Sequence, residues 1–70
     1  MIDVNITQFE PKRTIFKNKF EDRYSAKKWI HSMFDCFADG CEIADHYDIM
    51  FLMMDGLPVA SAVLGGSDDR

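Results

Sequence analysis

Two cysteines and a histidine are the residues of this chain whose types and spacing come closest to a chemical site. Cys36, Cys41 and His46 follow a C-x4-C-x4-H spacing, and thiolates and imidazoles are zinc ligands. Asp35 or His31 could supply a fourth ligand. The spacing is not that of a standard zinc knuckle, and Cys36 borders an apolar helical stripe, so a thiol at the edge of the core is the better interpretation. We predict no metal and no cofactor.

Catalytic groups form no pattern that predicts an enzyme. No Ser lies in a sharp turn flanked by Gly, and no Ser, His and Asp set suggests a triad. Gly65-Gly66 is not a phosphate loop because no helix follows it. The acidic run from Asp39 to Asp48 lacks the glycine position of a calcium-binding EF-hand loop. We expect a protein without catalytic activity.

Charge is divided unevenly along the sequence. The net charge is −4, yet the basic residues gather between Lys12 and Lys28, and no Lys or Arg occurs from Trp29 to Asp69. Two interpretations stay open. Both stretches are solvated faces, or the molecule is dipolar, with an acidic end that repels nucleic acid and attracts basic protein surfaces.

Apolar periodicity predicts an amphipathic helix. Apolar residues recur at i, i+3, i+4, i+7, i+8 and i+11, namely Ala26, Trp29, Ile30, Met33, Phe34 and Phe37. Ser25 is a natural N-cap, with Asp22 as its rival. Asp39-Gly40 suits a left-handed C-terminal stop. We predict a helix from about Ser25 to Ala38.

Strand signals flank this helix on both sides. Residues 1–6 alternate between apolar and polar, and a second strand runs from Thr14 to Phe20. Residues 47–54 and 57–64 are joined by Asp55-Gly56, the signature of a type I′ hairpin turn. We predict an α+β domain of order ββαββ, with a four-stranded, mostly antiparallel sheet and the helix on one face. Residues 1–64 form the domain and residues 65–70 a flexible tail.

The predicted hairpin is apolar on both faces. A two-residue turn makes Met54 face Leu57 and Leu52 face Val59, while neighbouring pairs place further apolar residues on the other face. A half-solvated antiparallel sheet normally alternates apolar with polar residues, and one helix covers only one face. Either the first two strands or the tail fold over the second face, or a homodimer or protein partner covers it. Adaptable side chains for such a contact are present in the hairpin, namely Met50, Met53 and Met54.

A basic strand offers an alternative function. Lys and Arg alternate with Phe16 and Phe20 around residues 12–19, which suits a small homodimeric module that binds a nucleotide-like ligand or nucleic acid. The sequence pI of about 4.8 opposes this, because phosphate binding depends on a positive field. Direct nucleic-acid binding is therefore disfavoured.

One family resemblance covers the full length. Three segments carry this resemblance, namely the helix SAKKWIHSMFDCF, the acidic stretch DCFADGCEIADHYD and the hairpin YDIMFLMMDGLPVASAVL. In overall style, the domain that they form resembles the small phage-encoded inhibitors of host defence, anti-CRISPR proteins among them. These inhibitors share no common motif, so no functional residue is transferred. The resemblance implies a non-enzymatic inhibitor that binds and blocks a larger nucleic-acid-handling complex of the host. A subunit of a larger assembly without an inhibitory role is a further alternative.

An acidic surface is the predicted contact with that protein partner. Carboxylates there could meet the Lys and Arg groups that normally hold phosphates, and a neighbouring aromatic ring could anchor the interface. The residues are Asp35, Asp39, Glu42, Asp45, Tyr47 and Asp48. The opening segment MIDVNITQFE has no secretory signal, and no apolar run approaches the ~20 residues of a membrane span. We therefore expect a cytoplasmic protein without a membrane partner.

Overall fold

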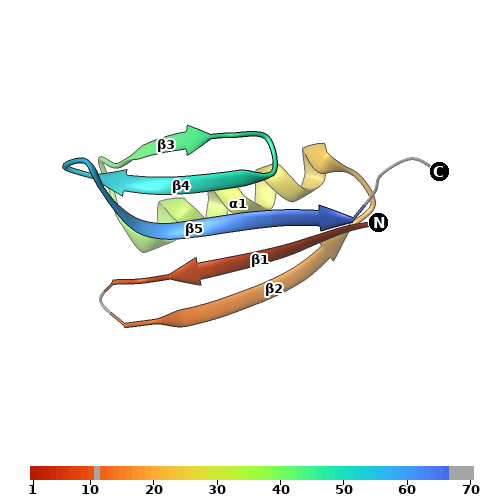
Figure 1. Cartoon of the computed structure of the whole chain (residues 1–70), viewed down its shortest axis with the longest axis horizontal. Coiled ribbons are helices and arrows are strands. Elements are labelled where there is room, and N and C mark those ends of the chain that lie inside the picture. Colours follow the sequence, from red (N-terminus) through yellow and green to blue (C-terminus); the bar gives the residue numbers. More distant parts are fainter. Residues whose placement is uncertain (11, 67–70) are drawn as a thin grey trace.

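Five antiparallel strands and one helix make up the computed structural model, which describes residues 1–10 and 12–66 (Figure 1). The elements are β1 (Ile2–Gln8), β2 (Thr14–Phe20), α1 (Arg23–Phe37), β3 (Glu42–Asp45), β4 (Ile49–Met54) and β5 (Leu57–Gly66). The strand order across the sheet is β2-β1-β5-β4-β3. β5 is therefore the central strand, and it joins the N-terminal hairpin to the β3–β4 unit.

The predicted four-stranded ββαββ sheet is wrong, because a fifth strand follows the helix. Among the described residues, β3 pairs only with β4, from Glu42↔Met53 to Asp45↔Met50. Its four residues, EIAD, are too few for the apolar alternation by which a strand is recognised in sequence. The pairing surface of β4 gives this segment its structure. The broader α+β class holds.

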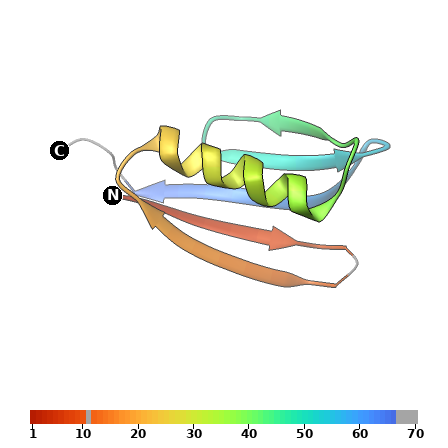
Figure 2. The same cartoon turned by 180° about the vertical axis from the view of Figure 1, so that it is seen from behind.

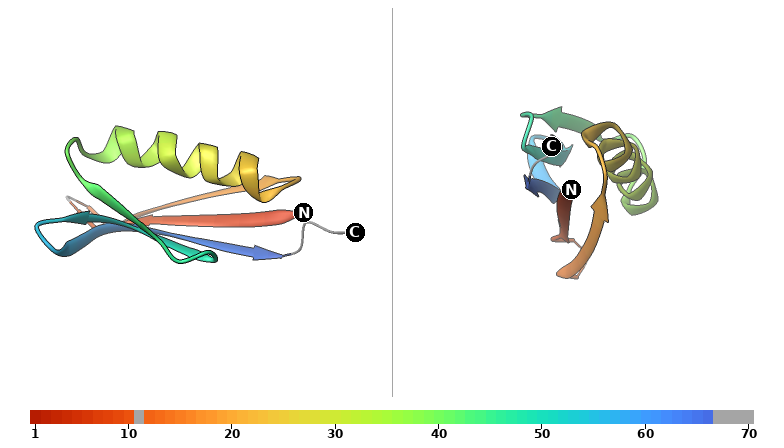
Figure 3. Two further views of the ribbon diagram at one scale, coloured as in Figure 1. Left: turned by 90° about the horizontal axis from the view of Figure 1, so that it is seen from above. Right: turned by 90° about the vertical axis from the view of Figure 1, so that its right-hand side faces the viewer.

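The helix covers one face of the sheet, and no helix or strand of residues 1–10 and 12–66 lies on the other face (Figures 2 and 3). Ala26, Ile30 and Phe34 are fully buried, four residues apart along the face that meets the sheet. The sheet side chains beneath them are also buried, namely Ile2, Val4, Ile6, Met50, Leu52, Ala60, Ala62 and Leu64. The other three residues of the apolar stripe are only half-buried, at the side of the helix, namely Trp29, Met33 and Phe37. The helix therefore buries fewer side chains completely than its apolar periodicity predicts.

Both helix ends differ from the prediction. Asp22 is the N-cap, because its carboxylate accepts a hydrogen bond from the Ser25 backbone N–H at 2.8 Å. The helix therefore begins at Arg23, two residues earlier than predicted. It ends at Phe37, where Ala38 adopts an extended conformation. Gly40, with φ of 72°, is the left-handed residue, but it lies in the loop beyond the cap.

The hairpin turn forms as predicted, but its register shifts after two pairs. Asp55 and Gly56 have φ of 53° and 80°, as a type I′ turn requires. A bulge between Leu52 and Met53 then pairs Leu52 with Ala60, where we predicted Val59. The extra residue follows Pro58, which has no N–H to donate to a ladder. Because a one-residue slip moves every later side chain to the other face, the small alanines of β5 point toward the helix.

The C-terminal strand continues past the predicted domain boundary at residue 64. Gly65 and Gly66 pair with Asp3 and Ile2 of β1. The rest of the predicted tail, residues 67–70, lies outside the described residues. The first two strands belong to the same sheet as the hairpin, so they do not fold over its second face.

Candidate protein-binding surfaces

An ion-pair cluster lies at the N-terminal end of the helix and contains three of the predicted contact residues, Asp45, Tyr47 and Asp48. The Arg23 guanidinium contacts the Asp48 carboxylate and donates a hydrogen bond to the Tyr47 carbonyl at 2.9 Å. Lys27 Nζ lies 3.0 Å from both carboxylate oxygens of Asp45. The Tyr47 ring lies against Arg23, with 4.0 Å between the guanidinium carbon and the ring centroid. The cluster thus ties α1 to the β3–β4 connection.

Charge in this cluster is balanced within the chain. The hydrogen bond from Lys27 is the main cause that lowers the pKa of Asp45, and the Tyr47 backbone N–H, which donates to the same carboxylate, lowers it further. That backbone contact also holds Tyr47 at φ of 70°, a left-handed conformation that is uncommon for a residue other than glycine. Asp45 and Asp48 therefore act as internal partners of the helix. We base the binding proposal on other carboxylates.

The six predicted contact residues do not form one surface. Asp45, Tyr47 and Asp48 contact Arg23 and Lys27 in the first turns of α1. Asp39 instead follows the C-terminal end of α1, and Glu42 lines a depression with Asp55 and Gly56 of the β4–β5 turn. Asp35 is exposed in the last turns of α1. Within the described part of the chain, no ion pair involves the carboxylates of Asp35, Asp39 or Glu42.

Apolar side chains are exposed at the end of the molecule where α1 stops. Leu57 is 68% exposed and Met54, its partner across the hairpin, is 42% exposed. They adjoin a depression lined by Phe37, Ala38, Met54, Val59 and Glu10. Asp39 follows Ala38 directly, and Asp55 follows Met54. We call this surface, formed by Phe37, Met54, Leu57 and Val59 with the carboxylates of Glu10, Asp39 and Asp55, the apolar end.

A second surface is the side of the sheet that faces away from the helix, which we call the open face. Strand alternation and pairing assign to it Asp3, Asn5, Thr7, Ile15, Lys17, Lys19, Glu42, Ala44, Ile49, Phe51, Met53, Ser61 and Val63. Its β1–β2 half is polar except for Ile15, which is 56% exposed, and its β4 residues are apolar. Val63 on the central strand is 43% exposed, and His46 meets Phe51 edge-on at 6.3 Å between ring centroids.

The three methionines of the hairpin lie in three different environments. Met50 is fully buried beneath the helix, Met53 lies on the open face, and Met54 belongs to the apolar end. The sequence predicts one adaptable contact surface for all three. The sheet alternation and the end of α1 separate them.

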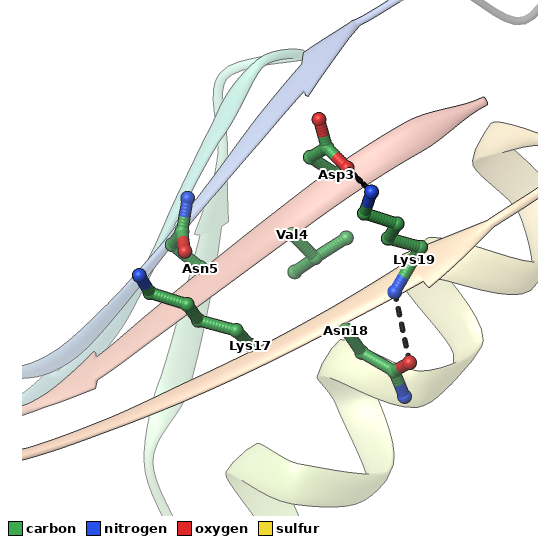
Figure 4. A pocket seen from close by; sticks show the side chains of 6 residues that line it. All are labelled: Asp3, Val4, Asn5, Lys17, Asn18 and Lys19. Atoms are coloured by element: carbon green, nitrogen blue, oxygen red, sulfur yellow. Dashed lines mark hydrogen bonds and ion pairs between the residues drawn. The ribbon is translucent and has the colours of Figure 1, made fainter.

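The basic strand β2 lacks the free aromatic rings that single-stranded nucleic acid stacks on. Phe16 packs on Phe37 and Phe20 on Trp29, with ring centroids 5.6 and 5.5 Å apart. Its cations stand beside polar groups of β1, with Lys19 3.9 Å from Asp3 and Lys17 next to Asn5 (Figure 4). The strand therefore presents charge without a stacking platform.

The cysteine and histidine residues do not converge. Cys36 is exposed, Cys41 is half-buried with its thiol 3.8 Å from the Asp39 carbonyl, and both thiols are free. In residues 1–10 and 12–66, no three His, Cys, Asp or Glu side chains are grouped so that they could hold a metal ion. Over the same residues, α1 is neither long nor apolar enough to cross a membrane.

Two features of the structure were not predicted from the sequence, the ion pairs of α1 and the apolar end. Arg23 and Lys27 are four residues apart, so they share one side of the helix. Asp45 and Asp48 are three residues apart, and each binds one of these two cations. The two spacings are the sequence signal for the ion pairs. The apolar end has no such signal, because its side chains come from α1, β4 and β5.

Comparisons with protein-family models, with curated proteins and with solved structures found no match to this chain.

Proposed function

We propose that this chain is a non-enzymatic inhibitor that binds a basic protein surface of a nucleic-acid-handling complex through its apolar end. The observation that carries the proposal is the exposure of Met54 and Leu57 beside carboxylates that no cation of the described chain neutralises. Isolated exposed apolar residues are ordinary, but here they adjoin an apolar depression. Protein interfaces often combine such an apolar centre with a polar rim.

Carboxylates at the rim support a basic partner. Glu10 lines the apolar depression, and Asp39 and Asp55 follow two of its lining residues, Ala38 and Met54, directly in the chain. No ion pair of the described residues involves these three carboxylates. Complementary rim charges raise the association rate and select among partners. Protein surfaces that hold phosphates are rich in Lys and Arg, so carboxylates can compete for the same groups. The net charge of −4 supports the same choice of partner.

Matched surface variants test this function. Leu57→Ser removes an apolar side chain that is 68% exposed, and Tyr24→Ser removes one that is 73% exposed on the helix. Neither should unfold the chain. The wild-type chain would first capture proteins from a nuclease-treated lysate, and these would be purified. The affinity of each purified protein for every variant and for nucleic acid would then be measured.

We expect Leu57→Ser to weaken binding by roughly tenfold or more, the effect of losing an interface anchor. Tyr24→Ser should bind like wild type. Asp39→Asn with Asp55→Asn should weaken binding and reduce its dependence on salt, because rim charges are screened; Asn also tolerates the left-handed conformation at residue 55. Wild-type chain should displace nucleic acid from the partner. Equal binding by all variants, or a partner that keeps its nucleic acid, would contradict the proposal.

A further inference from the structure

The outer edge of β2 is a surface that the proposed function does not use. β2 stands first in the sheet order, and no other strand of the described chain pairs with its outer side. Its pairing with β1 runs in one unbroken register, and its seven residues include no proline. Bulges and prolines are common devices that stop an edge strand from pairing. β2 therefore presents a regular edge to a further strand.

Hydrogen bonds elsewhere in the sheet determine which backbone groups of β2 point outward. The Phe9 N–H donates to the Val59 carbonyl at 2.8 Å. Because hydrogen-bonded pairs alternate along antiparallel strands, the odd-numbered residues of β1 bond to β5 and its even-numbered residues bond to β2. The β2 partners of those even-numbered residues are Thr14, Phe16, Asn18 and Phe20. The N–H and C=O groups of Ile15, Lys17 and Lys19 therefore point away from the sheet.

One of these three outward N–H groups already has a partner within β2. The Lys19 N–H donates to the side-chain oxygen of Asn18 at 2.8 Å (Figure 4). No hydrogen bond within the described residues involves the N–H of Ile15 or Lys17. An added strand pairs with such groups, because its own N–H and C=O groups lie opposite them. Ile15 and Lys17 are thus the two positions where a further strand would bond to the edge.

The side chains of this edge select the charge of the added strand. Lys17 and Lys19 are exposed on the open face. Residues directly opposite them on an added strand would lie beside their ammonium groups, and opposite charges stabilise such cross-strand pairs. Lys19 has Asp3 at 3.9 Å, whereas Lys17 stands beside the neutral Asn5 (Figure 4). The edge therefore fits a strand that carries carboxylates at two positions separated by one residue.

A second copy of β2 does not fit this edge. In an antiparallel pair, the outward residues of the two copies must lie opposite one another. Depending on the register, Lys17 would face Lys17 or Lys19, or Lys19 would face Arg13. Like charges directly opposite each other destabilise a strand pair. The two lysines thus prevent β2 from pairing with itself and leave the edge open to an acidic strand.

The acidic edge strand β3 of a second copy does not fit either. The His46 N–H donates to the Ile49 carbonyl at 2.8 Å, so by the same alternation Glu42 bonds to β4 and Asp45 points outward. The Asp45 carboxylate already binds helix α1. Glu42 would face the opposite side of the joined sheet from Lys17, because side chains alternate between faces.

We infer that β2 binds an extended acidic segment of a partner protein by strand addition, antiparallel to β2, with carboxylates opposite Lys17 and Lys19. A peptide uses both the N–H and the C=O groups of the edge, whereas phosphates only accept hydrogen bonds. The rings of Phe16 and Phe20 pack on helix residues, so nucleic-acid bases have no stacking platform. This inference does not depend on the proposed inhibitor function, which uses the apolar end.

A short synthetic peptide tests the inference. With blocked ends, it reads valine, aspartate, threonine, glutamate, valine, valine, and it is designed to lie opposite residues 20 to 15 in that order. Titration of the whole chain should give saturable binding with a Kd below ~1 mM. Hydrogen exchange followed by NMR should show the amides of Ile15 and Lys17 exchanging fast in the free chain and slowly in the complex. The absence of saturable binding, or new protection at other residues only, would overturn the inference.

Backbone methylation of the peptide separates strand addition from simple charge attraction and leaves the protein unchanged. A methyl group on the glutamate nitrogen, opposite Lys17, removes an N–H that would point at β2. It should weaken binding by roughly tenfold or more, the effect of a lost hydrogen bond with added crowding. A methyl group on the threonine nitrogen, opposite Asn18, would lie on the outer side of the peptide and should leave the affinity close to that of the parent. Equal losses for the two peptides would contradict strand addition.

Two charge reversals in the chain test the role of Lys17. Lys17→Glu should weaken peptide binding by roughly fivefold or more, because an attraction becomes a repulsion. Lys28→Glu changes the net charge equally at an exposed position of the helix and should bind like wild type. A peptide with lysine in place of its glutamate should bind Lys17→Glu more tightly than it binds wild type. Equal effects of the two variants would contradict the inference, and tighter binding of a thymidine oligonucleotide than of the peptide would favour nucleic acid instead.

Discussion

Truncation of Phe34 tests whether the helix stripe is the main source of stability. Phe34 is fully buried between α1 and the sheet, and its ring centroid lies 6.2 Å from that of Phe37. Replacing a buried Phe by Ala costs roughly 3–5 kcal/mol, as the sum of lost transfer energy and a new cavity. A domain of 70 residues has a total stability of roughly 4–10 kcal/mol. Phe34→Ala should therefore leave a chain that is barely folded.

A milder variant makes the loss measurable. Phe34→Leu keeps an apolar side chain and should cost about 1–2 kcal/mol, which lowers the melting temperature by roughly 4–15 °C in a domain of this size. Tyr24→Ala, at an exposed position of the same helix, should change stability by less than about 0.5 kcal/mol. Thermal melts followed by circular dichroism, at one fixed protein concentration, measure all three variants. If Phe34→Ala melts like wild type, the packing of α1 on the sheet is not as described.

Three further predictions concern the strand ends, the ion-pair cluster and the turn. Gly66→Ala should destabilise the chain by about 1–3 kcal/mol in urea unfolding, because φ is 87° and the new Cβ would clash with the Met1 carbonyl oxygen. Gly65→Ala, where a Cβ meets nothing within 4 Å, is the control. The folded state lowers the pKa of Asp45 from 3.8, so its stabilising effect is present above that pH and is lost as pH falls through the folded pKa. The difference in unfolding free energy between wild type and Asp45→Asn should accordingly shrink in acid, and a constant difference from pH 7 to about pH 2 would contradict this. Gly56→Val should sharply reduce the yield of folded protein, since a β-branched residue resists positive φ, and an unchanged melting temperature would argue against the type I′ turn.

The ion-pair cluster changes how the acidic surface should be tested. Reversal of charge at Asp45 and Asp48 would remove the partners of Lys27 and Arg23. A loss of binding in that variant would therefore report on the fold as well as on a partner. Asp39 and Asp55 lie outside the cluster, which makes them the cleaner positions for a binding experiment.

Sequence predicted the helix and the turn because each depends on residues close together in the chain. The stripe that contains Ile30 and Phe34 follows the helical period, and the turn needs only two residues that tolerate positive φ. Asp22, the N-cap, is one of the two cap residues that the sequence predicts, since N-capping involves only the first turn. The fifth strand was missed because β3 has only four residues and depends on β4 for its pairing.

The amino-acid sequence by itself determined the α+β class, the apolar stripe of the helix, the Asp55-Gly56 turn and the separation of basic from acidic residues along the chain. Only the tertiary structure decided which charges are free. Arg23 and Asp48 are 25 residues apart, and Lys27 and Asp45 are 18 apart, so their pairing depends on where α1 lies against the β3–β4 connection. The bulge in the hairpin likewise determines which side chains face the helix. Local propensities act over a few residues, whereas these contacts exist only after the chain has folded back on itself.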